Sequence, residues 1–107
     1  MNIAIIPARS GSKRIKNKNL KEFYGKPIIA WSIEEAINSK CFDEIIVSTD
    51  SPWIAEVAKE YGAKVPFLRS NQNSNDNATI FDAIHEVILF YKKIDLNPKI
   101  ITCIFAT

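Results

Sequence analysis

Short apolar segments alternate with helical patterns along the whole of this 107-residue chain. The first segment, Asn2–Pro7, is almost continuously hydrophobic, which is typical of a strand buried on both faces of a parallel sheet. Three further strands are predicted over Glu44–Thr49, Lys64–Phe67 and Lys99–Phe105. Because parallel strands need a crossover connection, normally a helix, this alternation predicts an α/β fold.

The connections carry helical patterns with local start and stop signals. Pro27 precedes a stripe over residues 29–37, and Ser51-Pro52 precedes a second stripe that Gly62 ends. The third predicted stripe consists of Phe81, Ile84, Ile88 and Tyr91.

The order of these elements predicts a Rossmann-like open, mainly parallel sheet with helices on both faces. The length suits one domain core, so residues 1–107 are expected to form a single nucleotide-binding domain. Only Ala106-Thr107 follows the last strand, at the point where α/β proteins collect site residues. We therefore expect the N-terminal portion of a longer domain, truncated after its fourth strand.

The basic residues are concentrated early in the chain. The net charge is +2, yet residues 9–26 hold seven Lys or Arg and one Glu, which leaves the remainder negative. Such asymmetry favours a local anionic ligand over a uniformly basic surface. The apolar runs are too short to span a membrane, no export signal is visible, and Cys41 and Cys103 lack metal-ligand spacing. A cytoplasmic protein without membrane contact is expected.

The loop that leaves the first predicted strand combines small residues with cations. Residues 7–19 have the sequence P-A-R-S-G-S-K-R-I-K-N-K-N, in which Gly11 allows backbone N–H groups to approach a ligand closely. Backbone donors and cationic side chains together suit a triphosphate. Neither a Walker A loop nor a dinucleotide fingerprint fits. A solvated charged loop and a nucleic-acid-binding arm remain alternatives, but no platform of exposed aromatics supports the second.

Three ordered blocks carry a resemblance to a known family. They have the sequences I-I-P-A-R-S-G-S-K-R-I-K-N-K-N at 5–19, G-K-P-I-I-A-W-S-I at 25–33 and I-I-V-S-T-D at 45–50. These blocks resemble the cytidylyltransferases that activate sialic-acid-type sugars, and the similarity runs through the whole chain. The ending F-A-T at 105–107 departs from the Q-P-T-S-P of the family's N-acetylneuraminate enzymes.

The resemblance implies a nucleotide-diphospho-sugar transferase-like fold and an enzyme that transfers CMP from CTP to a nine-carbon sugar acid, releasing pyrophosphate. Pseudaminic acid is the favoured acceptor and N-acetylneuraminic acid the next, for surface glycan or flagellin glycosylation. The resemblance also implies Mg²⁺, with metal ligands from outside these residues, and a homodimer at full length. A truncated module that binds nucleotide without turnover is the alternative.

The resemblance also assigns residues. Lys18 and Arg9 are the expected catalytic residues, through contacts with the phosphates. Arg69, Asp50 and Thr79 are weaker candidates for substrate binding, and Asp50 has the alternative role of capping the helix that follows it. The expected nucleotide-binding residues are Ala8, Arg9, Ser10, Gly11, Ser12, Lys13, Lys18 and Asn19.

Overall fold

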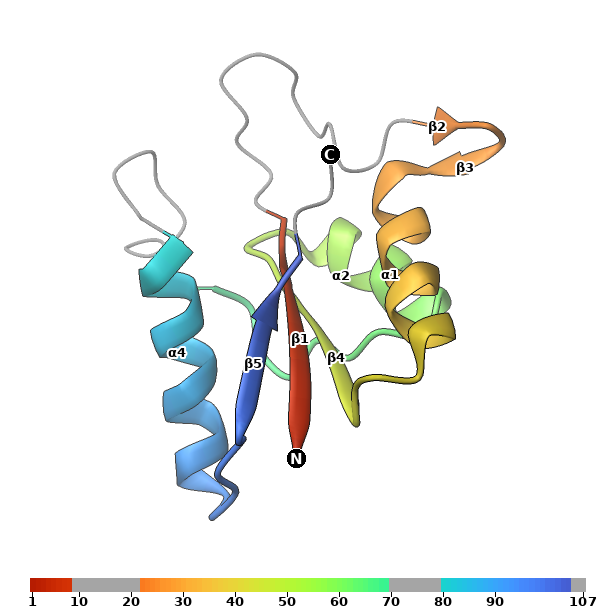
Figure 1. Ribbon diagram of the computed structural model, residues 1–107. Helices are drawn as coiled ribbons and strands as arrows, with labels where there is room; N and C mark the ends of the chain where they lie inside the picture. Colours follow the sequence, from red (N-terminus) through yellow and green to blue (C-terminus); the bar gives the residue numbers. More distant parts are fainter. Residues whose placement is uncertain (9–21, 70–79, 105–107) are drawn as a thin grey trace.

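The computed structural model describes residues 1–8, 22–69 and 80–104 (Figure 1). None of the helices within these ranges is long and apolar enough to cross a bilayer. In chain order the elements are β1 (Asn2–Pro7), β2 (Glu22–Phe23), β3 (Lys26–Pro27), α1 (Ile28–Ser39), β4 (Glu44–Ser48), α2 (Pro52–Glu60), α4 (Ile80–Lys93) and β5 (Ile100–Cys103).

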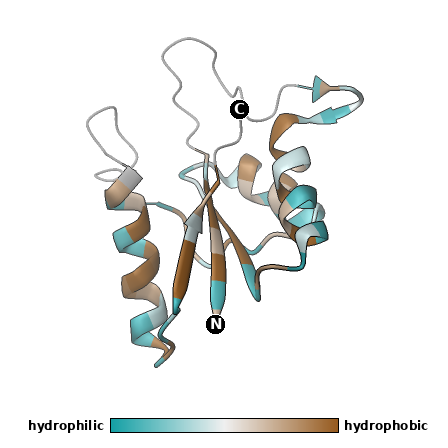
Figure 2. Ribbon diagram, viewed as in Figure 1, coloured by the Kyte–Doolittle hydropathy of each residue, from teal (hydrophilic) through white to brown (hydrophobic). Residues whose placement is uncertain are grey.

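The central sheet has the strand order β4-β1-β5, and both strand pairs are parallel. Ile5 of β1 lies opposite Ile46 of β4 and Cys103 of β5. The four middle residues of β1 are buried, which explains why its sequence is almost continuously apolar. Figure 2 shows hydrophobic residues along all three strands. The predicted parallel α/β sheet is confirmed.

Helices cover opposite faces of this sheet (Figure 1). On one face, Ala4 and Ile6 of β1 pack with residues of α1 and α2 such as Ile33 and Ile54. On the other face, Ile3 and Ile5 pack with α4 through Val87 and Tyr91. The alternation of side chains along β1 therefore divides its residues between two apolar clusters, as expected for a strand between two helical layers.

Local signals set the helix boundaries close to their predicted positions. Pro27 is the N-cap of α1, and Ser51 is the N-cap of α2, where its Oγ accepts a hydrogen bond of 3.2 Å from the Ile54 N–H. Gly62 follows α2 with a φ of +103°, and a Cβ there would lie 2.9 Å from the Ile37 Cδ1 atom. Glycine is therefore favoured at this stop by its backbone conformation, and another residue would also require the Ile37 side chain to move.

The strand predicted over residues 64–67 is wrong. Only Lys64 forms a bridge with β4: its N–H donates to the Ile45 carbonyl over 2.8 Å, and its carbonyl accepts from the Val47 N–H over 3.0 Å. Pro66 follows two residues later without an N–H group, so a ladder cannot continue through it.

The short β2–β3 hairpin was not predicted. Its two antiparallel strands are joined through Tyr24 and Gly25, which both have positive φ values, 53° and 89°. Two positive values suit the tight turns of hairpins, although tyrosine is an unusual residue to adopt one. The sequence signal for this turn is Gly25, because glycine adopts a positive φ readily.

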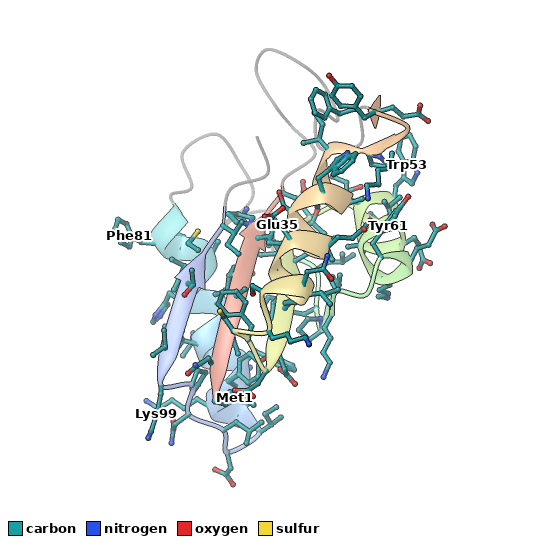
Figure 3. All side chains as sticks on the ribbon, turned by 45° about the vertical axis from the view of Figure 1, so that its right-hand side comes forward. Met1, Glu35, Trp53, Tyr61, Phe81 and Lys99 are labelled. Carbon is teal, nitrogen blue, oxygen red and sulfur yellow. The ribbon has the colours of Figure 1, made fainter. Side chains whose placement is uncertain are left out.

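The apolar stripe predicted for the third helix is buried in part: Tyr91 is buried, and Ile84 packs against the same apolar cluster. Ala83, Val87 and Tyr91 are buried against the sheet, whereas Phe81 is 76% exposed and Ile88 is 36% exposed. Figure 3 shows Phe81 pointing outward from α4. Both sets of residues repeat at helical spacing, so periodicity alone does not decide which set faces the sheet.

A polar cluster joins three segments near the amino ends of the strands. The first residue of β4, Glu44, accepts hydrogen bonds from the Tyr91 hydroxyl of α4 and from Lys64 Nζ, the latter over 2.8 Å. Burial and the neighbouring carboxylate raise the pKa of Tyr91 well above its ordinary value. Burial alone would raise the pKa of Glu44, but the hydrogen bonds from Lys64 and Tyr91 outweigh it and leave that pKa lowered.

These shifts predict how stability depends on pH. Because the pKa of Glu44 is lowered by folding, its contribution is present above its ordinary pKa near 4.5 and is lost as the pH falls below it. Because the pKa of Tyr91 is raised, its contribution is present below its ordinary pKa of 10 and is lost as the pH rises above it. Urea unfolding across pH 3–11 should therefore show both declines.

Two variants identify the groups responsible. Glu44→Gln should lose part of the acid decline, and Tyr91→Phe part of the alkaline decline, each measured against the parent chain. If the free energies of unfolding of both variants depend on pH as that of the parent chain does, in acid and in alkali, this assignment is contradicted.

Candidate functional site

The carboxyl ends of all three parallel strands meet at one edge of the sheet, uppermost in Figure 1. Backbone hydrogen bonds hold the residues that follow them: the Ala8 N–H donates to the Ser48 carbonyl over 2.8 Å, and the Ile104 N–H donates to the Ile5 carbonyl over 2.9 Å. In open α/β sheets, ligands bind beyond this edge. We therefore take this edge as the candidate site.

The edge contains a topological switch point between β1 and β5. The connection from β1 to β4 places α1 on one face of the sheet, whereas the connection that leads to β5 places α4 on the opposite face. Where helices leave for opposite faces, a crevice forms between the two strand ends. Ala8 and Ile104 follow the two strands that border this point.

The end of β4 contributes three polar residues in succession. Ser48 and Thr49 are buried, and Asp50 is half-buried. The Thr49 Oγ1 accepts a hydrogen bond of 3.1 Å from the Ser51 N–H, which fixes the turn into α2. Since Ser51 supplies the N-cap side chain, the alternative that Asp50 caps this helix is wrong.

Arg69 reaches the same edge from a distant part of the chain. Its backbone N–H donates to the Thr49 carbonyl over 2.8 Å, and the residue is only 8% exposed. The structure therefore brings together three residues predicted from the sequence, Ala8, Asp50 and Arg69, at the carboxyl ends of β1 and β4. Burying the charged side chain of an arginine costs free energy unless other groups compensate for its charge. Buried arginines are therefore uncommon, and Arg69 stands out for this reason among the residues of the edge.

Ala8 is held by the sheet. Its N–H donates to the Ser48 carbonyl and its side chain is buried in the cluster beneath α1 and α2. These contacts fix the direction in which the chain leaves β1, and the nucleotide-binding role of Ala8 stays a prediction. The other predicted residues lie outside the described residues, so their roles stay predictions: Arg9, Ser10, Gly11, Ser12, Lys13, Lys18, Asn19 and Thr79.

Sequence reasoning missed Ser48 as a candidate. It is 3% exposed, and its Oγ has no hydrogen-bond partner among the residues that the structure describes. A buried hydroxyl without a partner is costly, so an acceptor or donor at this edge would be favourable. The available signal was its position before Thr49-Asp50, at the end of a strand that is otherwise apolar.

The described residues offer limited reactive chemistry at this edge. Burial raises the pKa of the Cys103 thiol, which disfavours the nucleophilic thiolate form. Within residues 1–8, 22–69 and 80–104, no three His, Cys, Asp or Glu side chains gather to hold a metal ion. The edge as described is therefore suited to binding and positioning a polar ligand.

The fold and this edge define a Rossmann-like α/β protein. Residues 3–105 match the profile of a family described as cytidylyltransferase, and the chain belongs to that family. The match includes all the described strands and helices as well as the predicted loop between β1 and β2.

Named relatives agree with this assignment. The chain is 47% identical over 106 residues to the pseudaminic acid cytidylyltransferase of Campylobacter jejuni subsp. jejuni serotype O:23/36 (strain 81-176), covering 99% of this chain and 46% of the relative. It is 44% identical over 94 residues to the CMP-N,N'-diacetyllegionaminic acid synthase of Legionella pneumophila subsp. pneumophila (strain Philadelphia 1), covering 88% of this chain and 40% of the relative. The chain therefore spans less than half the length of these relatives.

A solved structure supports the fold. CMP:2-keto-3-deoxy-manno-octonic acid synthetase, in complex with CTP, superposes with a TM-score of 0.78 at 27% identity. The superposition covers 98% of this chain and 39% of that protein. The α/β architecture is thus shared with a nucleotide-sugar synthetase.

Proposed function

We propose that this chain is the nucleotide-binding part of a cytidylyltransferase that transfers CMP from CTP to a sialic-acid-like nonulosonic acid. The family match across residues 3–105 carries the proposal. Pseudaminic acid is the favoured acceptor, because two pseudaminic acid cytidylyltransferases are 47% and 44% identical over 99% of this chain. N-acetylneuraminic acid, the next candidate from the sequence, is supported by an N-acylneuraminate cytidylyltransferase that is 43% identical over 83% of the chain, and a legionaminic acid is supported by the synthase that is 44% identical over 88% of it.

In the proposed reaction, the anomeric hydroxyl of the sugar attacks the α-phosphorus of CTP. A new P–O bond forms, the bond to the β-phosphate oxygen breaks, and pyrophosphate leaves. Such a displacement depends mainly on positioning and on neutralising charge. Lys18 and Arg9 are proposed to contact the phosphates, while Ala8 fixes where their loop leaves the sheet.

Mg²⁺ is implied by the family resemblance, but the described residues do not provide a site for it. No cluster of three potential ligands occurs among them, and Asp50 is the one carboxylate directly after β4. We therefore assign no step of the reaction to a metal ion held by these residues.

Nucleotide binding tests the proposal directly. Calorimetric titration of the chain with CTP and with ATP should show saturable binding of CTP and a clear preference for it. No binding at millimolar CTP, or equal affinity for ATP, would count against the proposed function.

The alternative kept from the sequence is a module that binds CTP without turnover. Incubation with CTP, Mg²⁺ and pseudaminic acid, followed by a pyrophosphate assay, separates the two. Sustained release supports transfer by this chain itself, whereas CTP binding without release supports the module.

A further inference from the structure

The hydroxyl of Ser48 lies at the carboxyl end of β4, within the edge described above. The residue is 3% exposed, and its Oγ is buried without a hydrogen-bond partner among the residues that the structure describes. A buried hydroxyl that makes no hydrogen bond costs folding free energy, and such groups are uncommon in native proteins. Stability alone therefore does not account for a serine at this position.

The alternation of side chains along β4 places this hydroxyl on the α4 face of the sheet. Ile46 belongs to the apolar cluster beneath α4, whereas Val47 belongs to the cluster beneath α1 and α2. Ser48 follows Ile46 by two residues and therefore shares its face. As the last residue of β4, Ser48 lies at the edge of the core beneath α4 and not within it.

The helix that covers this face does not complete the hydroxyl. The residues of α4 that are buried against the sheet are Ala83, Val87 and Tyr91. The first two have apolar side chains, and the Tyr91 hydroxyl donates to Glu44 at the opposite end of β4. A hydrogen-bond partner for Ser48 must therefore come from elsewhere at the edge.

The backbone that carries this hydroxyl is fixed on both sides. The Ser48 carbonyl accepts a hydrogen bond of 2.8 Å from the Ala8 N–H of the β1 end, and the Thr49 carbonyl accepts one of 2.8 Å from the Arg69 N–H. A ligand that bonds the hydroxyl would not have to order this segment first. Such preorganisation favours binding, because less conformational entropy is lost.

We propose that the Ser48 hydroxyl forms a hydrogen bond with the CMP part of bound CTP. Ligands of open α/β sheets bind beyond the carboxyl ends of the strands, where Ser48 lies. The β- and γ-phosphates carry most of the negative charge and suit the cation-rich residues 9–26, whereas an uncharged hydroxyl on the neighbouring strand suits the less charged remainder. A hydroxyl both donates and accepts, so it can bond either kind of polar atom there. The proposal rests on the proposed function, because CTP is the ligand.

Ser48→Ala tests this role through two effects of opposite sign. Removing an unsatisfied buried hydroxyl should raise the melting temperature of the ligand-free chain by about 4–8 °C, measured by circular dichroism. Removing a hydrogen bond to the ligand should weaken binding of CTP and of CMP by about 3- to 10-fold each, measured by calorimetric titration. Binding of pyrophosphate should stay within about two-fold of the parent.

Ser51→Ala is the matched control, because it removes the same hydroxyl group three residues further on, where that group has an internal partner. The Ser51 Oγ accepts from the Ile54 N–H and caps α2. Its loss should therefore lower the melting temperature by several degrees and leave CTP affinity within about two-fold of the parent.

The outcomes separate this proposal from the proposed function. A melting temperature that falls in Ser48→Ala would show that the hydroxyl has an internal partner, and would overturn the proposal. Unchanged CTP affinity in Ser48→Ala would also overturn it, as would a loss of affinity for pyrophosphate equal to that for CTP. A parent chain that does not bind CTP would instead refute the proposed function.

Discussion

Replacing Lys18 with alanine should weaken CTP binding by about 10- to 100-fold without lowering the melting temperature of the chain. A hydrogen bond involving a charged group contributes about 1.5–3 kcal/mol, and each 1.4 kcal/mol corresponds to a factor of ten in affinity. Lys18 belongs to a polar, basic stretch of sequence, so its loss should not disturb the apolar core. Arg9→Ala should have a similar effect, measured by calorimetric titration.

The control for this prediction is Lys92→Ala, which removes the same charge from an exposed position in the last turn of α4. It should leave CTP affinity within about two-fold of the parent, because a distant surface charge is screened by salt. If Lys92→Ala weakens CTP binding as much as Lys18→Ala does, Lys18 contributes to CTP affinity only through the net charge of the chain. If Lys18→Ala unfolds the chain while the folded fraction keeps its affinity, the residue is structural.

The fold could be predicted wherever a segment is buried on both sides. Asn2–Pro7 is a continuous apolar run because helices cover both faces of β1, and the predicted boundaries match the observed strand. The edge segment at 64–67 has only one neighbour, and Pro66 interrupts its hydrogen bonds, so its apolar residues gave a misleading strand signal. For α4, the predicted stripe and the buried face share Tyr91, and tertiary packing decides that Ala83 and Val87 lie beside it in place of Phe81 and Ile88.

From the sequence, the candidate site could be predicted only as far as the edge of the sheet at which it lies. Ala8 and Asp50 lie beyond the carboxyl ends of their strands as expected, and Arg69, a weaker candidate from the resemblance, reaches the same edge through its bond to Thr49. The sequence could not show which of two adjacent polar residues, Asp50 or Ser51, caps α2, because both are good N-cap residues. Nor could it show that the Ala8 N–H is used within the sheet, since this depends on the position of Ser48 in the neighbouring strand.

The buried face of α4 leads to the largest expected effect on stability. Tyr91 is 2% exposed and packs against Ile3, Ile5 and Ile46 of the sheet. Truncating a buried aromatic side chain costs about 3–5 kcal/mol, so Tyr91→Ala should lower the free energy of unfolding by that amount. Tyr91→Phe keeps the ring and removes only the hydroxyl that donates to Glu44, so it should cost about 1.5–3 kcal/mol.

Phe81→Ala is the matched control, because it removes an aromatic side chain of similar size from an exposed position of the same helix. With Phe81 76% exposed, its loss should change the free energy of unfolding by no more than about 0.5 kcal/mol. Urea unfolding followed by circular dichroism measures all three variants under one condition. The loss of unfolding free energy should be largest for Tyr91→Ala, smaller for Tyr91→Phe and smallest for Phe81→Ala, because Tyr91 lies on the buried face of α4. If Phe81→Ala were instead the most damaging, Phe81 would be buried, and α4 would have to be rotated on the sheet.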